Sequence, residues 1–241
     1  MSPANFLRMF TAVELPGPTR DAVAALGQRI VEECRTSVRE RRAGAPERRA
    51  GVRGLREVPP ENLHVTVRFL GDVERSQVDP IVEALRAAVS DVPAAVTEVA
   101  GVSAFPSRRH PRVVWRGVAD PAPLAELEAA VGRALRGVGF GSDEEPYTPH
   151  GTLARVNDRS TADALAPHLA AAHRDAPRFG ELVVDHLTVF QSHLDRDTSS
   201  DGRGAPRRRA PHYQVRGRLP LGRSVRPGRA GGARASSKPQ K

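Results

Sequence analysis

Asn62–Asp72 reads Asn-Leu-His-Val-Thr-Val-Arg-Phe-Leu-Gly-Asp, an alternation typical of a β-strand. Large apolar residues alternate with polar ones, namely Leu63, Val65, Val67 and Phe69 with His64, Thr66 and Arg68. Successive side chains of a strand point to opposite faces. We therefore expect one apolar face toward the core and one face that carries an imidazole, a hydroxyl and a guanidinium. Those three groups are suited to binding a phosphate ester.

A second copy of the pattern lies downstream, in Pro149-His150-Gly151-Thr152-Leu153-Ala154-Arg155. Each copy follows a Pro-containing loop, has an apolar residue directly after its Thr, and is followed by an Arg, which is Arg68 in the first and Arg155 in the second. Strict alternation would place Arg155 on the face opposite to His150. Its use beside His150 therefore requires a bulge or a twist in the strand.

A third His-x-Thr, His186 and Thr188, has a different context. It lies in the middle of the apolar run Leu182–Thr188, with Val184 on the same face as His186 and no Arg after it. Roughly 0.3 such triplets are expected by chance in this composition, so a single match carries no information. We interpret His186 as a core or sheet-surface histidine.

The chain has 241 residues, enough for one large or two small domains, and a formal net charge of +9. Two segments are basic: residues 34–56 carry a net charge of +6, and residues 222–241 carry +6 with no acidic residue. The remainder is therefore slightly acidic, at −3. A basic segment favours a polyanionic partner, and it is equally typical of a solvated, disordered appendage.

Cys34 is the only cysteine, so a disulfide within the chain and a cysteine-based zinc site are excluded. A single cysteine suits a reducing cytoplasm. No apolar run approaches the length of a bilayer span, and the first ten residues lack the apolar core of a signal peptide. We expect a soluble, cytoplasmic protein with no membrane contact.

Periodicity predicts alternating strands and helices. The expected strands are 7–15, 62–72, 96–105, 112–118, a segment within 146–156, 181–191 and 212–221. The expected helices begin at an N-cap Thr19, span 78–89 and 121–138, and run from a cap at Ser160 or Thr161 to Ala172. The two halves share one order of elements, which suggests an internal duplication. The two motif strands would then be equivalent strands on opposite sides of a cleft.

The motifs resemble those of the 2H phosphoesterase superfamily. One runs into Phe69-Leu70-Gly71 and the other into Leu153-Ala154-Arg155. Further segments resemble its RNA 2′,3′-cyclic phosphodiesterase branch, also called LigT-like or 2′-5′ RNA ligase: Arg8–Phe10 through Leu15-Pro16, Pro59–His64, Ala104–Pro106 and Pro111–Trp115. The resemblance covers most of residues 7–221. It departs at the Arg-rich insert, at Glu57 and at Gly151, where a glycine within a strand could loosen it.

The resemblance implies an α+β, bilobal fold in which two antiparallel sheets face each other across a cleft, with helices outside and pseudo-two-fold symmetry. We expect residues 1–221 to form this single domain. It would include a mobile Arg-rich insert at about 35–56 and a polar loop at about 195–211. We expect residues 222–241 to be a disordered basic tail.

Opening a cyclic phosphodiester needs a base that activates water and an acid that protonates the departing ribose oxygen, and imidazole can serve as either near neutral pH. Spacing alone leaves open which histidine is which. The resemblance implies that His64 is the proton donor and His150 the acceptor. Thr66 and Thr152 would donate to the non-bridging oxygens, with Arg155 and Arg68 as further substrate-binding residues. We expect no metal and no cofactor.

The resemblance thus implies a monomeric hydrolase that converts RNA 2′,3′-cyclic phosphate ends, for example on tRNA fragments, to 2′-phosphomonoesters. Weak reverse 2′-5′ RNA ligation would follow from microscopic reversibility. Two alternatives remain. One is a phosphodiesterase for another cyclic or 2′-5′ nucleotide, such as ADP-ribose 1″,2″-cyclic phosphate. The other is a non-catalytic RNA-binding module that uses the basic segments.

Overall fold

The computed structural model describes residues 5–41, 54–140, 146–175, 177–193, 196–200, 206–208 and 210–222. Most of the Arg-rich insert and all but the first residue of the basic tail lie outside these ranges. The helices are α1 (Gly17–Arg41), α2 (Val78–Val89), α3 (Ala122–Gly137) and α4 (Arg159–Arg174), with 3₁₀ turns η2 (Pro60–Asn62) and η3 (Arg75–Gln77). None of the described helices has both the length and the hydropathy to cross a bilayer.

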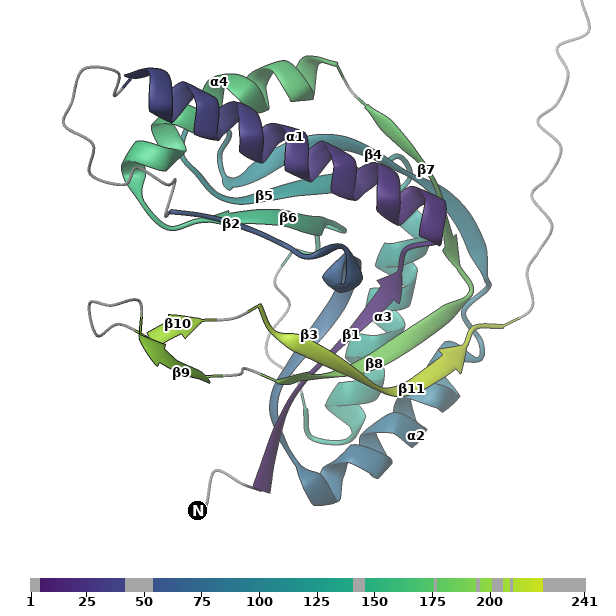
Figure 1. Cartoon of the computed structure of the whole chain (residues 1–241). Helices are drawn as coiled ribbons and strands as arrows, with labels where there is room; N and C mark the ends of the chain where they lie inside the picture. The colour runs from purple at the N-terminus through teal and green to yellow at the C-terminus, as the bar shows by residue number, and fades with distance from the viewer. Residues whose placement is uncertain are drawn as a thin grey trace, which may run out of the picture.

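Two antiparallel sheets form the centre of the molecule (Figure 1). The first sheet has the order β11-β8-β1-β3, built from β11 (His212–Pro220), β8 (His186–His193), β1 (Phe6–Glu14) and β3 (His64–Glu74). The second sheet has the order β2-β6-β5-β4-β7, built from β2 (Leu55–Glu57), β6 (Gly151–Val156), β5 (Pro111–Val118), β4 (Ala95–Pro106) and β7 (Arg178–Val184). A separate hairpin pairs β9 (Arg196–Ser200) with β10 (Pro206–Arg208).

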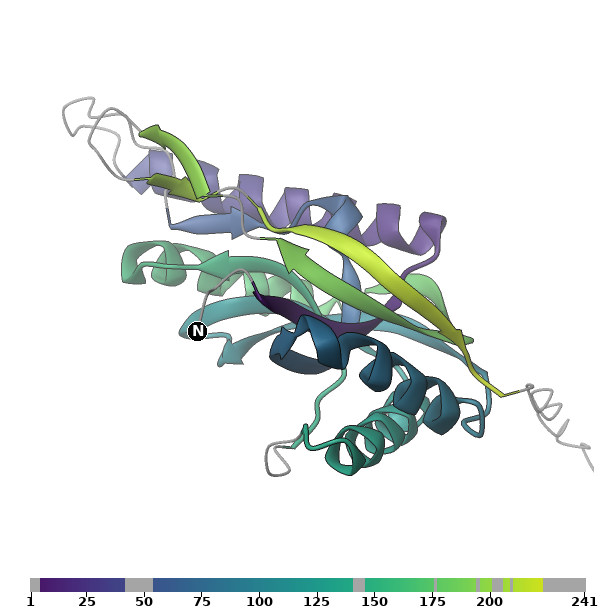
Figure 2. The same ribbon diagram turned by 90° about the horizontal axis from the view of Figure 1, so that it is seen from below.

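Each sheet has a pair of helices on its outer face. Helices α2 and α3 pack on each other and on the first sheet, and α1 and α4 do the same on the second (Figures 1 and 2). The helices bury stripes of Leu, Val and Ala, for example Leu124, Leu127 and Val131 of α3. This burial of apolar surface is the main driving force for the α+β arrangement that the sequence predicted.

The two sheets are related by a pseudo-two-fold repeat in which each half of the chain gives its final strand to the other sheet. Counted outward from the motif strand, the order β3-β1-β8-β11 corresponds to β6-β5-β4-β7, with β2 as an additional edge strand. In chain order, and leaving out β2 and β7, β1-α1-β3-α2-β4 corresponds to β5-α3-β6-α4-β8. Strand β4 crosses into the second sheet and β8 into the first. The element order seen in the sequence is therefore a structural repeat, but neither sheet is built from one half alone.

Several predicted boundaries are wrong. Helix α1 continues to Arg41, inside the expected mobile insert. The expected strand 181–191 is two strands in different sheets, because the chain crosses between them at Asp185. Thr19 lies within the first turn of α1 and donates from its hydroxyl to the carbonyl of Glu181 at 2.8 Å, so it is no N-cap. The polar segment 195–211 contains the β9–β10 hairpin.

Helix α4, which follows the second motif strand, is capped by Asp158 and not by Ser160 or Thr161 as predicted. The Asp158 carboxylate accepts from the backbone N–H of Thr161 at 2.9 Å and from its hydroxyl at 2.8 Å. The backbone hydrogen bond is the largest cause of a lowered Asp158 pKa.

We predict that Asp158→Ala lowers the free energy of unfolding by about 1 kcal/mol, because the first turn of α4 loses its acceptor. Since folding lowers this pKa, the stabilisation is complete above the ordinary carboxyl pKa and is lost as the pH falls below it. Urea denaturation at pH 7 and at pH 3 measures both effects. Asp163→Ala, an exposed acidic position on the same helix, is the control. An equal loss for the two variants at pH 7 would contradict the cap.

Candidate active site

The first motif strand contains a bulge directly after its threonine. In the pairing of β1 with β3, Thr11 lies opposite Arg68 and Ala12 opposite Thr66, so Val67 has no partner of its own. An extra residue reverses the alternation beyond it. Arg68 therefore turns to the helix side, and Phe69 comes to the face that carries Thr66.

This bulge overturns two predictions. Arg68 was expected beside His64, but its guanidinium pairs with the carboxylate of Glu128 on α3 and packs against Gly132. Phe69 was expected in the core, but it is 68% exposed. Arg68 therefore holds α3 against the first sheet, away from the motif residues.

The second motif strand also contains a bulge directly after its threonine. In the pairing of β5 with β6, Val114 lies opposite Ala154 and Trp115 opposite Thr152, so Leu153 is the extra residue. The reversal brings Arg155, which is exposed, to the face of Thr152. The bulge that a role for Arg155 requires is present in the structure.

His64 is held at the start of β3 by a hydroxyl, a carbonyl and aromatic rings. Its Nε2 lies 3.1 Å from the Thr66 hydroxyl, and its ring donates to the backbone of Asn62. The ring stacks on Phe10 with centroids 5.0 Å apart and meets Tyr213 edge-on at 5.5 Å. Burial lowers the pKa of His64 to about 4, although the hydrogen bond to Asn62 opposes the shift.

His150 has a corresponding environment. It was expected inside the motif strand, but it directly precedes β6, which begins at Gly151. Its Nδ1 donates to the carbonyl of Thr148 at 2.7 Å. The ring packs edge-on against Phe105, with centroids 5.0 Å apart, and lies 5.9 Å from Trp115. Burial lowers the pKa of His150, and the carbonyl of Thr148 opposes the shift. Both histidines thus bond to the carbonyl two residues earlier in the chain.

Several interactions bring the two motifs together. The hydroxyl of Tyr147, just before the second motif, donates to the carbonyl of Thr66 at 3.0 Å. His150 lies near enough to His64 to lower its pKa. A single cation, Arg116, lowers the pKa of both imidazoles. Residues of the two sheets therefore lie close together here, and each sheet contributes one imidazole and one threonine.

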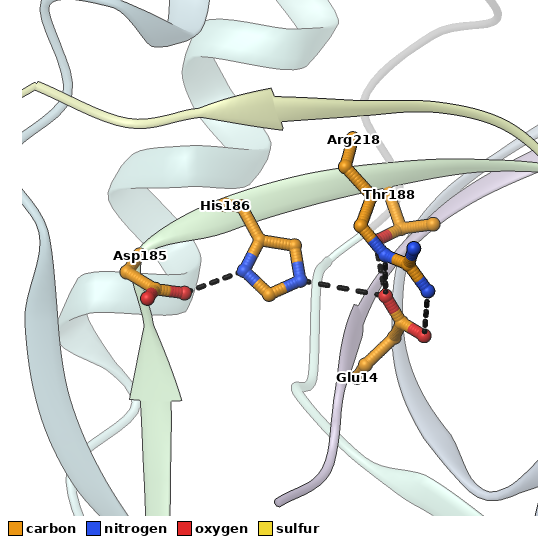
Figure 3. Close-up of polar contacts among 5 residues, drawn as sticks. All are labelled: Glu14, Asp185, His186, Thr188 and Arg218. Carbon is orange, nitrogen blue, oxygen red and sulfur yellow. Dashed lines mark hydrogen bonds and ion pairs between the residues drawn. The ribbon is translucent and has the colours of Figure 1, made fainter.

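The third His-x-Thr lies beside this site and binds a carboxylate (Figure 3). Glu14 accepts from the Thr188 hydroxyl at 2.8 Å and from both Nε (2.8 Å) and Nη2 (3.1 Å) of Arg218. His186 lies between Asp185, at 2.5 Å, and Glu14, at 3.4 Å. The pKa of Glu14 falls to about 2, mainly through Arg218. His186 and Thr188 therefore fix Glu14, as befits a sheet-surface histidine.

Glu14 also affects the first motif. It lies opposite His64 in the pairing of β1 with β3, and its negative charge raises the pKa of His64. The positive charges near His150 are Arg116 and Arg155, both of which lower its pKa. The two imidazoles thus differ electrostatically: a carboxylate lies near one, and a second arginine lies near the other. Within the described ranges, no group of three His, Cys, Asp or Glu side chains could hold a metal ion.

Comparison with known proteins identifies the family. A model of the 2′-5′ RNA ligase superfamily matches residues 22–196. The chain belongs to the 2′-5′ RNA ligase superfamily. This match spans both motifs, from α1 to the β9–β10 hairpin, and it confirms the resemblance seen in the sequence.

Individual proteins similar to this chain support the same family assignment. An RNA 2′,3′-cyclic phosphodiesterase of Archaeoglobus fulgidus is 34% identical over 160 residues, which are 66% of this chain and 86% of the relative. One of Aeropyrum pernix is 36% identical over 143 residues, which are 59% of this chain and 79% of the relative. The crystal structure of E. coli LigT complexed with 3′-AMP has a TM-score of 0.57 at 21% identity, covering 90% of this chain and 98% of that one. This likeness shows the fold.

The bulges predict opposite effects for two arginines. Arg68→Met should lower the free energy of unfolding by about 1–3 kcal/mol, because Glu128 loses its partner, and should leave the His150 pKa unchanged. Arg155→Met should leave stability nearly unchanged and raise the His150 pKa, because a nearby positive charge is removed. Urea denaturation and NMR titration of the imidazole rings measure the two quantities. If the His150 pKa shifted in Arg68→Met and not in Arg155→Met, then Arg68 and not Arg155 would be the arginine near His150.

Proposed function

We propose that this protein hydrolyses RNA 2′,3′-cyclic phosphate ends to 2′-phosphomonoesters, with His64 as general acid and His150 as general base. The observation that carries the proposal is the meeting of two imidazoles from facing sheets, each bonded to the carbonyl two residues before it. Because Nδ1 of His150 is bonded to Thr148, its Nε2 is left to exchange a proton. The names of the curated relatives support the same substrate class.

The two histidines and one water molecule account for every proton transfer and bond change in this reaction. His150 takes a proton from water, whose oxygen attacks phosphorus, and the bond between phosphorus and O3′ breaks. His64 donates a proton to O3′, so the products are a 2′-phosphate and a free 3′-hydroxyl. Thr66 and Thr152 would donate to the non-bridging oxygens, and Arg155 would offset their charge. Attack by a 5′-hydroxyl in place of water would form a 2′-5′ linkage, and the protein would then have a weak ligase activity.

Charged neighbours distinguish the two histidines, although burial lowers both pKa values and lowers that of His64 to about 4. Glu14, held in its ionised form by Arg218, favours a proton on His64. Arg116 disfavours a proton on both rings, whereas Arg155 disfavours a proton on His150 alone. The choice of His64 as the donor and His150 as the acceptor therefore rests on the family resemblance, and Glu14 beside His64 is consistent with it.

We predict that the protein opens 2′,3′-cyclic nucleotides in the presence of EDTA, because an acid and a base suffice. His64→Ala and His150→Ala should each lower the rate roughly 10²- to 10⁴-fold. Anion-exchange chromatography separates the 2′- and 3′-nucleotide products. His168→Gln is a matched control, since His168 bonds to Ser37 between α4 and α1 on the outer face.

Three results would contradict the proposal. A 3′-nucleotide product would mean that the other ester bond breaks. No turnover in wild type, with RNA bound equally by wild type and His64→Ala, would favour the RNA-binding module. Faster turnover of ADP-ribose 1″,2″-cyclic phosphate or of a 2′-5′ dinucleotide in the same assay would favour the other phosphodiesterase.

We predict a bell-shaped pH profile of kcat/KM with its maximum below pH 6.5. Both imidazole pKa values are lowered in the free protein, to about 4 for His64, so both limbs lie on the acid side of the ordinary imidazole value. The profile of kcat should move to higher pH, because a bound phosphate anion favours protonated imidazole. A single ionisation in kcat/KM would exclude paired acid and base.

A further inference from the structure

Arg116 of β5 is fully buried and lacks any hydrogen-bond partner among the described residues. Its exposed fraction is 0%, and neither Nε, Nη1 nor Nη2 is bonded. Buried cations in proteins are normally paired, because removing a charge from water is unfavourable. Burial lowers the Arg116 pKa to about 9, so the group still carries its charge at neutral pH. The structure therefore maintains an unpaired cation in its interior.

The second motif makes room for this cation. Arg116 lies opposite Gly151 in the pairing of β5 with β6, and Gly151 separates His150 from Thr152. A Cβ at position 151 would lie 2.4 Å from both Cζ and Nη2 of Arg116. The guanidinium thus occupies the space that any other residue at position 151 would need for its side chain. The glycine in the motif, which looked like a weak point of the strand, is the complement of Arg116.

The place of Arg116 relates it to both histidines. Its charge lowers the pKa of His64, which belongs to the first sheet, and that of His150, which precedes a strand of the second sheet. Among the described residues no carboxylate is bonded to this guanidinium, and Glu14, the carboxylate beside His64, is bonded to Arg218, Thr188 and His186. The field of a buried charge is weakly screened, and so it is strong at the point where the imidazoles meet.

We propose that the buried guanidinium of Arg116 attracts the phosphate bound between His64 and His150. The inference rests on the proposed function, because it takes a phosphate anion as the ligand of that site. The charge that is unfavourable in the free protein becomes favourable when the anion enters. Gly151 is part of the same device, since it lets the guanidinium lie beneath the motif.

The test measures binding of inorganic phosphate by calorimetry in wild type, Arg116→Met, Arg116→Lys and the control Arg112→Met. Arg112 is an exposed arginine on the same strand, so its variant loses the same formal charge. Arg116→Met should weaken phosphate binding roughly 10- to 100-fold, and Arg112→Met at most about twofold. Arg116→Lys keeps a charge at this position and should bind between wild type and Arg116→Met.

Stability and titration separate this role from a structural one. Arg116→Met should raise the urea midpoint, because an unpaired buried charge is replaced by an apolar side chain. It should also raise the pKa of both His64 and His150, measured by NMR, because the positive charge near them is gone. A lower midpoint with phosphate affinity intact would make Arg116 a structural residue and would overturn the proposal.

A double-mutant cycle tests the link to Gly151. Gly151→Ala should displace the guanidinium and weaken phosphate binding in the wild-type background. In the Arg116→Met background it should have little further effect, because the displaced group is already absent. Additive effects of the two substitutions would overturn the proposed complementarity.

The proposed function can fail separately. If wild type opens the cyclic nucleotide but binds phosphate no better than Arg116→Met, the role of Arg116 is wrong and the hydrolase remains. If phosphate binding depends on Arg116 but wild type opens no cyclic nucleotide, the anion site stands and the hydrolase is wrong.

Discussion

One extra residue after each motif threonine decides which side chains can meet at the site. A strand with regular alternation would place His64, Thr66 and Arg68 together and would point Arg155 away from His150. The bulges at Val67 and Leu153 reverse both outcomes. Arg68 goes to α3, where it pairs with Glu128, and Arg155 comes to the face of Thr152. The same backbone device thus gives the two related strands different chemical surroundings.

The difference between the two halves is what the proposed reaction needs. In that proposed reaction the general acid and the general base are both imidazoles, so their neighbours must distinguish them. Arg116 acts on both rings, while Glu14 acts on His64 and Arg155 acts on His150. The pseudo-two-fold repeat supplies two equivalent histidines, and residues outside the repeated motif make them unequal.

Much of this could be predicted from the sequence, because period-2 and period-3.6 patterns report which side chains are buried. The α+β class, most strands and helices, and the residues of both His-x-Thr motifs follow from such patterns and from the family resemblance. The position of Arg68 and the exposure of Phe69 could not be predicted, since a bulge shifts the register without altering composition. The break at Asp185 was missed because β7 and β8 are both strongly β-forming and only this residue separates them.

Arg116 was missed for a different reason. It lies in an apolar stretch beside Trp115, far along the chain from both motifs, and only the pairing of β5 with β6 brings it to Gly151. The signal in the sequence was Gly151 itself, since a small residue within a motif indicates that another group approaches the backbone. Which group approaches depends on strand register, and register is a property of the folded sheet.

The exchange of final strands between the sheets also bears on how the chain folds. Strand β1 has β3 on one side and β8 on the other, and β8 begins only at His186. Until that segment leaves the ribosome, the early part of the chain has an open β edge, which can associate with other chains. Contacts so distant in sequence also slow folding. The two lobes should therefore form together, late in synthesis, and neither can act as an independently folding unit.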